Sequence, residues 1–267
     1  NTTYFMGEIS ATAWKSYFPT VYILKEPLPI LILMLISLIL AWPKLALGQM
    51  TVRLKKWIKN HIDELAWVVI IGIYWASSIS GNLNIGLRHV LPTFPFIYLL
   101  ISGKISQWIK PESQRFPSPI KLFLVAILVL WYVIESVLTF PYYLAYFNEL
   151  AGGPANGYKY AADSNLDWGQ DLRRLTNYVE KNKIEKIKLD YFGGGSPQYY
   201  LGDKYEKLDA NNSDQRHGWI AVSATLLQSG RGQPAKGYDR DTTYYNWLNQ
   251  YQPVTQIGYS IFVYKLD

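Results

Sequence analysis

Residues 120–140 read IKLFLVAILVLWYVIESVLTF, an apolar run in which Lys121 and Glu135 are the only charged residues. The hydrocarbon core of a bilayer takes about 20 apolar residues in helical form to cross. A helix satisfies every backbone polar group within the segment, as lipid requires. The run therefore predicts a membrane-spanning helix and an integral membrane protein.

Three further apolar runs, at 27–42, 65–80 and 86–102, predict a bundle of about four spans. The third is the least regular because it begins with Arg88 and His89 and contains two prolines. Proline removes a backbone donor and kinks a helix, so a buried or re-entrant segment is the alternative there.

Basic residues cluster in two of the connections between these runs, whereas the loop at 81–85 is uncharged. Basic loops stay cytoplasmic. We therefore expect a multi-pass plasma-membrane protein whose N-terminal segment and whose chain after residue 140 are extracytoplasmic. The clustered residues are Lys44, Arg53, Lys55, Lys56 and Lys59 in the first connection, with Lys104, Lys110, Arg115 and Lys121 around the last.

Composition limits the other functional classes. The net charge of +6 lies entirely in the first 140 residues, beside the apolar runs, so we expect no nucleic-acid partner. The absence of cysteine excludes disulfides and thiolate catalysis. The first residue is Asn1 and no signal-peptide pattern follows it, so we expect a chain that lacks its beginning.

From residue 141 the pattern changes to short amphipathic pieces. The sequence 167–170 (DWGQ) has the form of a capping box before a helix of roughly 170–182. Alternating apolar residues predict strands within 186–192, 219–223 and 258–266. A second helix is expected at 243–250.

These pieces predict a small extracytoplasmic α/β domain. The expected division is an outer-face segment at 1–26, a transmembrane region at 27–140 and the α/β domain at 141–267.

Spaced oxygen-bearing side chains at 163–171 resemble the first half of a calcium loop. Trp168 stands where the turn glycine belongs and Arg174 replaces the closing glutamate. Helix capping by Asp167 and Asp171 is therefore preferred, and neither a metal nor a cofactor is expected. The glycines of 193–196 (GGGS) predict a tight turn rather than a phosphate loop, because no Lys-Ser/Thr pair follows.

Each ionisable residue near the predicted span ends has two possible roles. Arg88 can bind a lipid phosphate through its planar guanidinium or extend to the headgroups, and His89 accompanies it. Lys25 allows the same choice, with extension to the headgroups favoured. Glu135 is either a functional acid or an interfacial structural residue, the second being favoured.

Several motifs in a fixed order resemble the C-terminal half of prokaryotic glycosyltransferases related to the protein O-mannosyltransferases, in the dolichyl- and polyprenyl-phosphate-mannose superfamily. They cover most of the chain, and their joint order is more specific than any one of them. The motifs are 4–10 (YFMGEIS), 17–19 (YFP), 25–29 (KEPLP), 86–89 (GLRH), 146–148 (YFN), 152–154 (GGP) and 163–170 (DSNLDWGQ).

The resemblance implies part of a GT-C fold and transfer of mannose or another hexose from a polyprenyl-phosphate donor to an acceptor protein or glycan on the outer face. It implies a catalytic acid upstream of Asn1, in a missing N-terminal half, so this chain alone is expected to be inactive. Arg88, His89 and Lys25 become candidates for the donor phosphate. The motif residues without an assigned role are Asp163, Asn165, Asp167, Trp168 and Gln170.

An alternative function is a non-catalytic membrane anchor whose outer domain binds a glycan or a protein. A transporter is disfavoured because the spans contain no repeat.

Overall fold

The computed structural model describes residues 2–41, 61–111, 113 and 115–267 and divides the chain into two compact units. The helical unit comprises Glu26–Gly81 and Arg88–Leu138. The mixed unit comprises Asn1–Lys25, Asn82–Leu87 and Thr139–Asp267. The N-terminal 25 residues thus form one compact unit with the C-terminal part, and this mixed unit is discontinuous in sequence. The five basic residues of the first connection lie outside the described residues.

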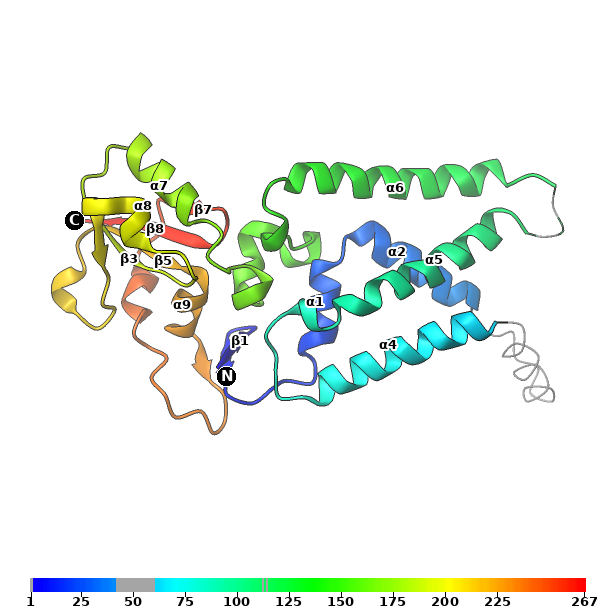
Figure 1. Cartoon of the computed structure of the whole chain (residues 1–267), viewed down its shortest axis with the longest axis horizontal. Helices are drawn as coiled ribbons and strands as arrows, with labels where there is room; N and C mark the ends of the chain where they lie inside the picture. Colours follow the sequence, from blue (N-terminus) through cyan, green and yellow to red (C-terminus); the bar gives the residue numbers. More distant parts are fainter. Residues whose placement is uncertain (1, 42–60, 112, 114) are drawn as a thin grey trace. The chain divides into compact units, whose positions relative to one another are not determined.

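The helical unit contains four described α-helices (Figure 1). Among the described residues, two helices are long and apolar enough to cross a membrane, and a third span is added if α1, Tyr17–Lys25, and α2 count as one broken span. The predicted four-span bundle is therefore confirmed only as two or three candidate spans. The helices are α2 Leu28–Ala41, α4 Ile62–Ser80, α5 Phe94–Ile109 and α6 Pro119–Thr139, of which α4 and α6 qualify alone.

The third predicted span differs most from its prediction. Residues 87–93 form two 3₁₀ turns, Leu87–His89 and Leu91–Thr93, and helix α5 begins only at Phe94. Both prolines occupy a first turn, where the missing N–H has no intrahelical partner to lose. They start the helix instead of kinking it.

An apolar core joins α2, α5 and α6. Leu33 packs with Ile101 and Ile105 of α5, and Val125 and Leu128 of α6 cover them. Many apolar side chains elsewhere on α4 and α6 are exposed. The packing supports a helical assembly whose outer surface suits hydrocarbon.

The mixed unit contains two sheets, and the larger one has the order β4-β3-β5-β8-β7. Strand β3 runs parallel to β4 and β5, whereas β8 is antiparallel to β5 and β7. The predicted α/β pattern is confirmed here. The strands are β3 Ile187–Asp190, β4 Tyr205–Lys207, β5 Gly218–Ser223, β7 Thr255–Ile257 and β8 Ile261–Leu266.

Helix α7, Leu172–Lys181, covers the larger sheet (Figure 1). Its residues Leu175 and Val179 are fully buried against Ile187 and Val263 of the strands. The spacing of these residues matches one helix face, and the predicted helix at 170–182 is confirmed. The second expected helix, at 243–250, is instead a 3₁₀ segment at Asn246–Gln250.

The N-terminal segment completes the mixed unit. Strands β1 Thr3–Phe5 and β2 Glu8–Ser10 form a small sheet with β6, Gln233–Pro234. Helix α1, Tyr17–Lys25, follows, and five of its nine residues are buried. Burial of these aromatic and branched side chains fixes the segment to the C-terminal part.

Candidate functional site

Asn165 lies at the centre of a polar network in the mixed unit. Its side chain is 1% exposed, and its amide nitrogen donates to the Tyr17 hydroxyl at 2.7 Å and to the Ala162 carbonyl at 3.2 Å. Its amide oxygen accepts from the Leu87 N–H at 3.0 Å. One buried amide therefore joins α1, the segment before Arg88 and the 163–170 motif.

Lys25 reaches the same network from the end of α1. Its Nζ donates to the carbonyl of Leu144 at 2.8 Å and to that of Asn165, and it lies 4.7 Å from the centre of the Phe147 ring. None of the ion pairs in the described part of the chain includes Lys25. Burial lowers the pKa of Lys25 to about 7, because the loss of solvent disfavours the charged amine.

Asn148 closes the C-terminal end of α1. Its backbone N–H donates to the Leu24 carbonyl at 2.8 Å, and its side-chain nitrogen donates to the Ile23 carbonyl at 2.6 Å. The last carbonyls of a helix have no partner within it. The 146–148 motif supplies those partners and so positions Lys25.

Asp167 is fully buried and accepts two backbone hydrogen bonds. One comes from the Thr225 N–H at 3.1 Å and the other from the Gly169 N–H at 3.3 Å. Burial raises the pKa of Asp167 to about 7, because desolvation outweighs both bonds. The carboxyl fastens the 163–170 motif to the junction of β5 and α9, Ala224–Ser229.

The predicted capping box at residues 167–170 is wrong. Residue Asp171 precedes α7, and no side chain caps that helix. The Gln170 oxygen instead accepts from the Trp168 N–H at 2.8 Å, while its nitrogen donates to the Leu166 carbonyl at 2.9 Å. Together with Asp167 these bonds shape a loop rather than a helix start.

Asp171 is held by its own set of partners, Ser260 and Arg174. Its carboxylate accepts from the Ser260 hydroxyl at 2.7 Å and pairs with Arg174, the residue where a calcium loop would have its closing glutamate. Burial raises its pKa. The described residues contain no group of three or more His, Cys, Asp or Glu side chains placed to hold a metal. Both acids serve as structural acceptors in this arrangement.

A cleft of about 550 Å³ opens beside this loop in the mixed unit. Trp168, 56% exposed, lines it together with the glycine turn predicted at 193–196. The sequence did not reveal the cleft, because Trp168 precedes α7 whereas the other lining residues come after β3. Its lining residues are Trp168, Tyr191, Phe192, Gly193 and Gly194.

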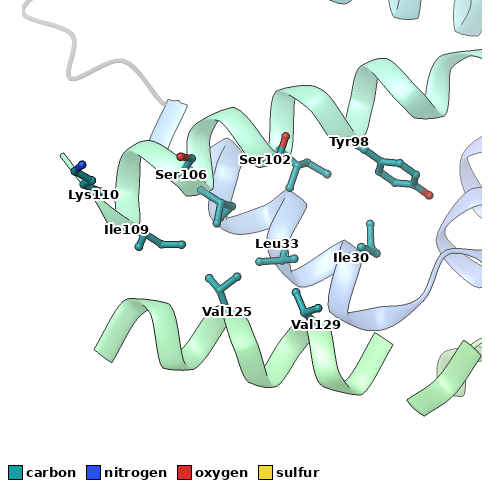
Figure 2. Close-up of a pocket in the computed structure, with 11 residues that line it drawn as sticks. Ile30, Leu33, Tyr98, Ser102, Ser106, Ile109, Lys110, Val125 and Val129 are labelled. Atoms are coloured by element: carbon teal, nitrogen blue, oxygen red, sulfur yellow. The ribbon is translucent and has the colours of Figure 1, made fainter. Parts of the chain in front are cut away.

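A second cavity, of about 430 Å³, lies in the helical unit among α2, α5 and α6 (Figure 2). Leu33 of α2 faces Val125 and Val129 of α6 across it, with Tyr98 at one end and Lys110 at the other. Its wall is mostly apolar, apart from hydroxyls on α5 and Lys110 directly after that helix. Such a wall suits a hydrocarbon chain.

Arg88 and His89 lie in the 3₁₀ turn Leu87–His89, before α5 in the helical unit. The residue before them, Leu87, belongs to the mixed unit and bonds to Asn165. Glu135 lies on α6, one turn before its end at Thr139. The roles of Arg88, His89 and Lys25 toward a phosphate stay predictions.

No protein-family model, curated protein or solved structure matches this chain.

Proposed function

We propose that this chain is the C-terminal part of an integral membrane glycosyltransferase of the GT-C type. The parent enzyme moves mannose or another hexose from a polyprenyl-phosphate donor to an acceptor protein or glycan on the outer face of the membrane. In this proposal four helices cross the membrane, and the mixed unit is extracytoplasmic.

One observation carries the proposal. Segments bearing the resemblance lie far apart in sequence, yet they meet in one network inside the mixed unit. Tyr17, Lys25 and Leu87 all bond to Asn165, and Asn148 holds the helix that ends in Lys25. Motifs that form a single structural centre are what a shared family architecture would produce.

In the proposed reaction the acceptor hydroxyl attacks the anomeric carbon of the sugar. The bond from that carbon to the phosphate oxygen breaks, and the polyprenyl phosphate leaves with the electron pair. A carboxylate supplied by the missing N-terminal half takes the hydroxyl proton. The first candidate to stabilise the negative charge of the departing phosphate is Arg88, and His89 and Lys25 are the other candidates for that role.

The apolar cavity of the helical unit suits the donor's lipid chain. Its wall of Leu33, Val125 and Val129 offers no hydrogen bonds to compete with hydrocarbon packing. This assignment needs no cofactor, because the leaving group carries its own activating phosphate.

The alternative is a non-catalytic, membrane-anchored binding module. The observation that favours it is the cleft beside Trp168, which lies wholly within the mixed unit and requires no catalytic acid. The first proposal predicts that the complete gene product transfers sugar, and the second predicts that it does not.

The test measures transfer from a radiolabelled polyprenyl-phosphate hexose in membranes containing the complete gene product. We expect Arg88→Ala to lower turnover by about 10²-fold, as the loss of one charged donor at a developing anion does. The matched control is Arg115→Ala, an exposed arginine beyond α5. Equal turnover in the wild type and both variants would remove Arg88 from the site. A lack of transfer by the wild type would favour the binding module.

A further inference from the structure

Gly193, which lines the cleft beside Trp168, lies against the backbone of Gly169. Gly169 and Gly193 approach each other so closely that a Cβ on either would lie 2.7 Å from the Cα of the other. The Tyr191 hydroxyl crosses this contact and donates to the Gly169 carbonyl at 2.6 Å. The two backbones can come this close because neither residue has a side chain, and the Tyr191 hydrogen bond fixes the contact.

The surroundings of Trp168 hold its backbone in place. Its N–H donates to Gln170, and the neighbouring residues Asp167 and Gly169 bond to each other. The indole is nevertheless more than half exposed. A large aromatic ring kept at the surface by a fixed loop has an entropic advantage as a binding platform, because little freedom is lost on binding.

The chemistry of the wall combines aromatic faces with bare peptide groups. Tyr191 and Phe192 are half-buried, and the peptides of Gly193 and Gly194 are exposed. Among the described residues, none of those that line the cleft carries a charge, so a charged ligand would lack the ion pair that strengthens its binding. The volume of about 550 Å³ lies within the range usual for small-molecule sites.

We infer that this cleft binds a pyranose ring of a neutral glycan, with the apolar face of the sugar stacked on Trp168 and its hydroxyls bonded to the peptide groups of the glycine turn. A pyranose has one face of C–H groups and a rim of hydroxyls, which matches a wall that is aromatic and polar in turn. The inference rests on the proposed function only in naming the ligand as part of the acceptor glycan. The binding site itself does not depend on catalysis.

Gly194 offers a sharp probe of the cleft. A Cβ there meets no heavy atom within 4 Å, and its backbone lies outside the left-handed region. A leucine at this position therefore meets no steric opposition at its Cβ and adds apolar bulk to a residue that lines the cleft. Tyr199 is the matched control, because it is 82% exposed and does not line the cleft.

The experiment is calorimetric titration of the full chain in detergent micelles with mannotetraose, cellotetraose and chitotetraose. We expect saturable binding of at least one of these sugars. Trp168→Ala and Gly194→Leu should each weaken it at least about ten-fold, Trp168→Phe should keep it within about three-fold, and Tyr199→Ala should leave it unchanged. Melting curves monitored by circular dichroism establish that each variant is folded.

Two results overturn the inference. One is that none of the three sugars binds the wild type at millimolar concentration. The other is that binding persists undiminished in both Trp168→Ala and Gly194→Leu. Sugar binding without transferase activity in the complete gene product would remove the proposed function alone, and transfer without binding at this cleft would remove this inference alone.

Discussion

The side-chain nitrogen of Asn165 donates to the hydroxyl of Tyr17 at 2.7 Å, although 148 residues separate them in the chain. This bond and the one from the Leu87 N–H make Asn165 the point at which three distant segments are held together. Buried polar groups of this kind strongly specify a fold when all their bonds are made.

Replacing Asn165 should destabilise the mixed unit. Asn165→Leu keeps the branch at Cγ but leaves the Leu87 N–H and the Tyr17 hydroxyl without this partner, at a cost of about 1–3 kcal/mol for each unsatisfied group. We expect the melting temperature of the chain in detergent to fall by several degrees. Asn249→Ala, at an exposed position, should leave it unchanged. Equal melting temperatures for both variants would show that the network adds little stability.

The C-terminal part should not fold without the N-terminal segment. Phe5, Ile9 and Phe18 are almost completely buried in the mixed unit, and removing them exposes their apolar partners. We expect residues 142–267 expressed alone to aggregate or to lack a near-ultraviolet circular dichroism signal. A monomeric product with a cooperative melt would contradict the discontinuous unit.

The regular elements of both units could be predicted from local patterns. The strand around Leu189 alternates apolar and polar residues, and α7 buries Leu175 and Val179 at helical spacing. The apolar runs of α4 and α6 are recognisable in the sequence by their length. Each of these signals is contained within a few turns of chain.

The site could not be predicted in the same way, because its decisive contacts are distant in sequence. Asp167 and Gln170 fit a capping box locally, but Thr225, 58 residues further on, supplies the donor that draws Asp167 into a loop. Likewise, nothing near Gly193 in the sequence indicates that its backbone meets Gly169. Only the tertiary structure brings these pairs together.

Gly169 should not tolerate a side chain. Its φ is +76°, and a Cβ would lie 2.3 Å from the Tyr191 hydroxyl oxygen. Gly169→Ala therefore combines backbone strain with a steric clash, and we expect a loss of about 1–3 kcal/mol. Thermal melting measures it, with Gly194→Ala as the control because a Cβ there is unopposed. A Gly169→Ala melting temperature as high as that of the control would contradict the close approach.

The stability of the mixed unit should fall as pH rises from about 4 to about 7. The pKa of Asp167 is about 7 in the folded state, whereas an exposed aspartate has a pKa near 4. The folded state therefore binds the proton more tightly, and this contribution is complete below about pH 4 and lost as pH rises through about 7. Its size is on the order of a few kcal/mol.

Melting temperatures between pH 4.5 and 8 check this dependence. The native chain should melt lower as pH rises to about 7, whereas above about 7 the lowered pKa of Lys25 adds stability with rising pH, because the folded state binds that proton less tightly. Asp167→Asn should show a shallower slope, with part of it retained because burial also raises the pKa of Asp171 and Asp190. An unchanged slope in Asp167→Asn would exclude Asp167 as the titrating group.

The proposed sidedness can be tested by single cysteines, because these 267 residues contain none. Asn211→Cys places a thiol on the exposed surface of the mixed unit, and Ser113→Cys places one between α5 and α6. If basic connections stay cytoplasmic, an impermeant maleimide added to intact cells should label only the first. After membrane permeabilisation both should react, which controls for the accessibility of Ser113→Cys. Labelling of Ser113→Cys in intact cells, with Asn211→Cys protected, would reverse the orientation and place the mixed unit on the cytoplasmic side.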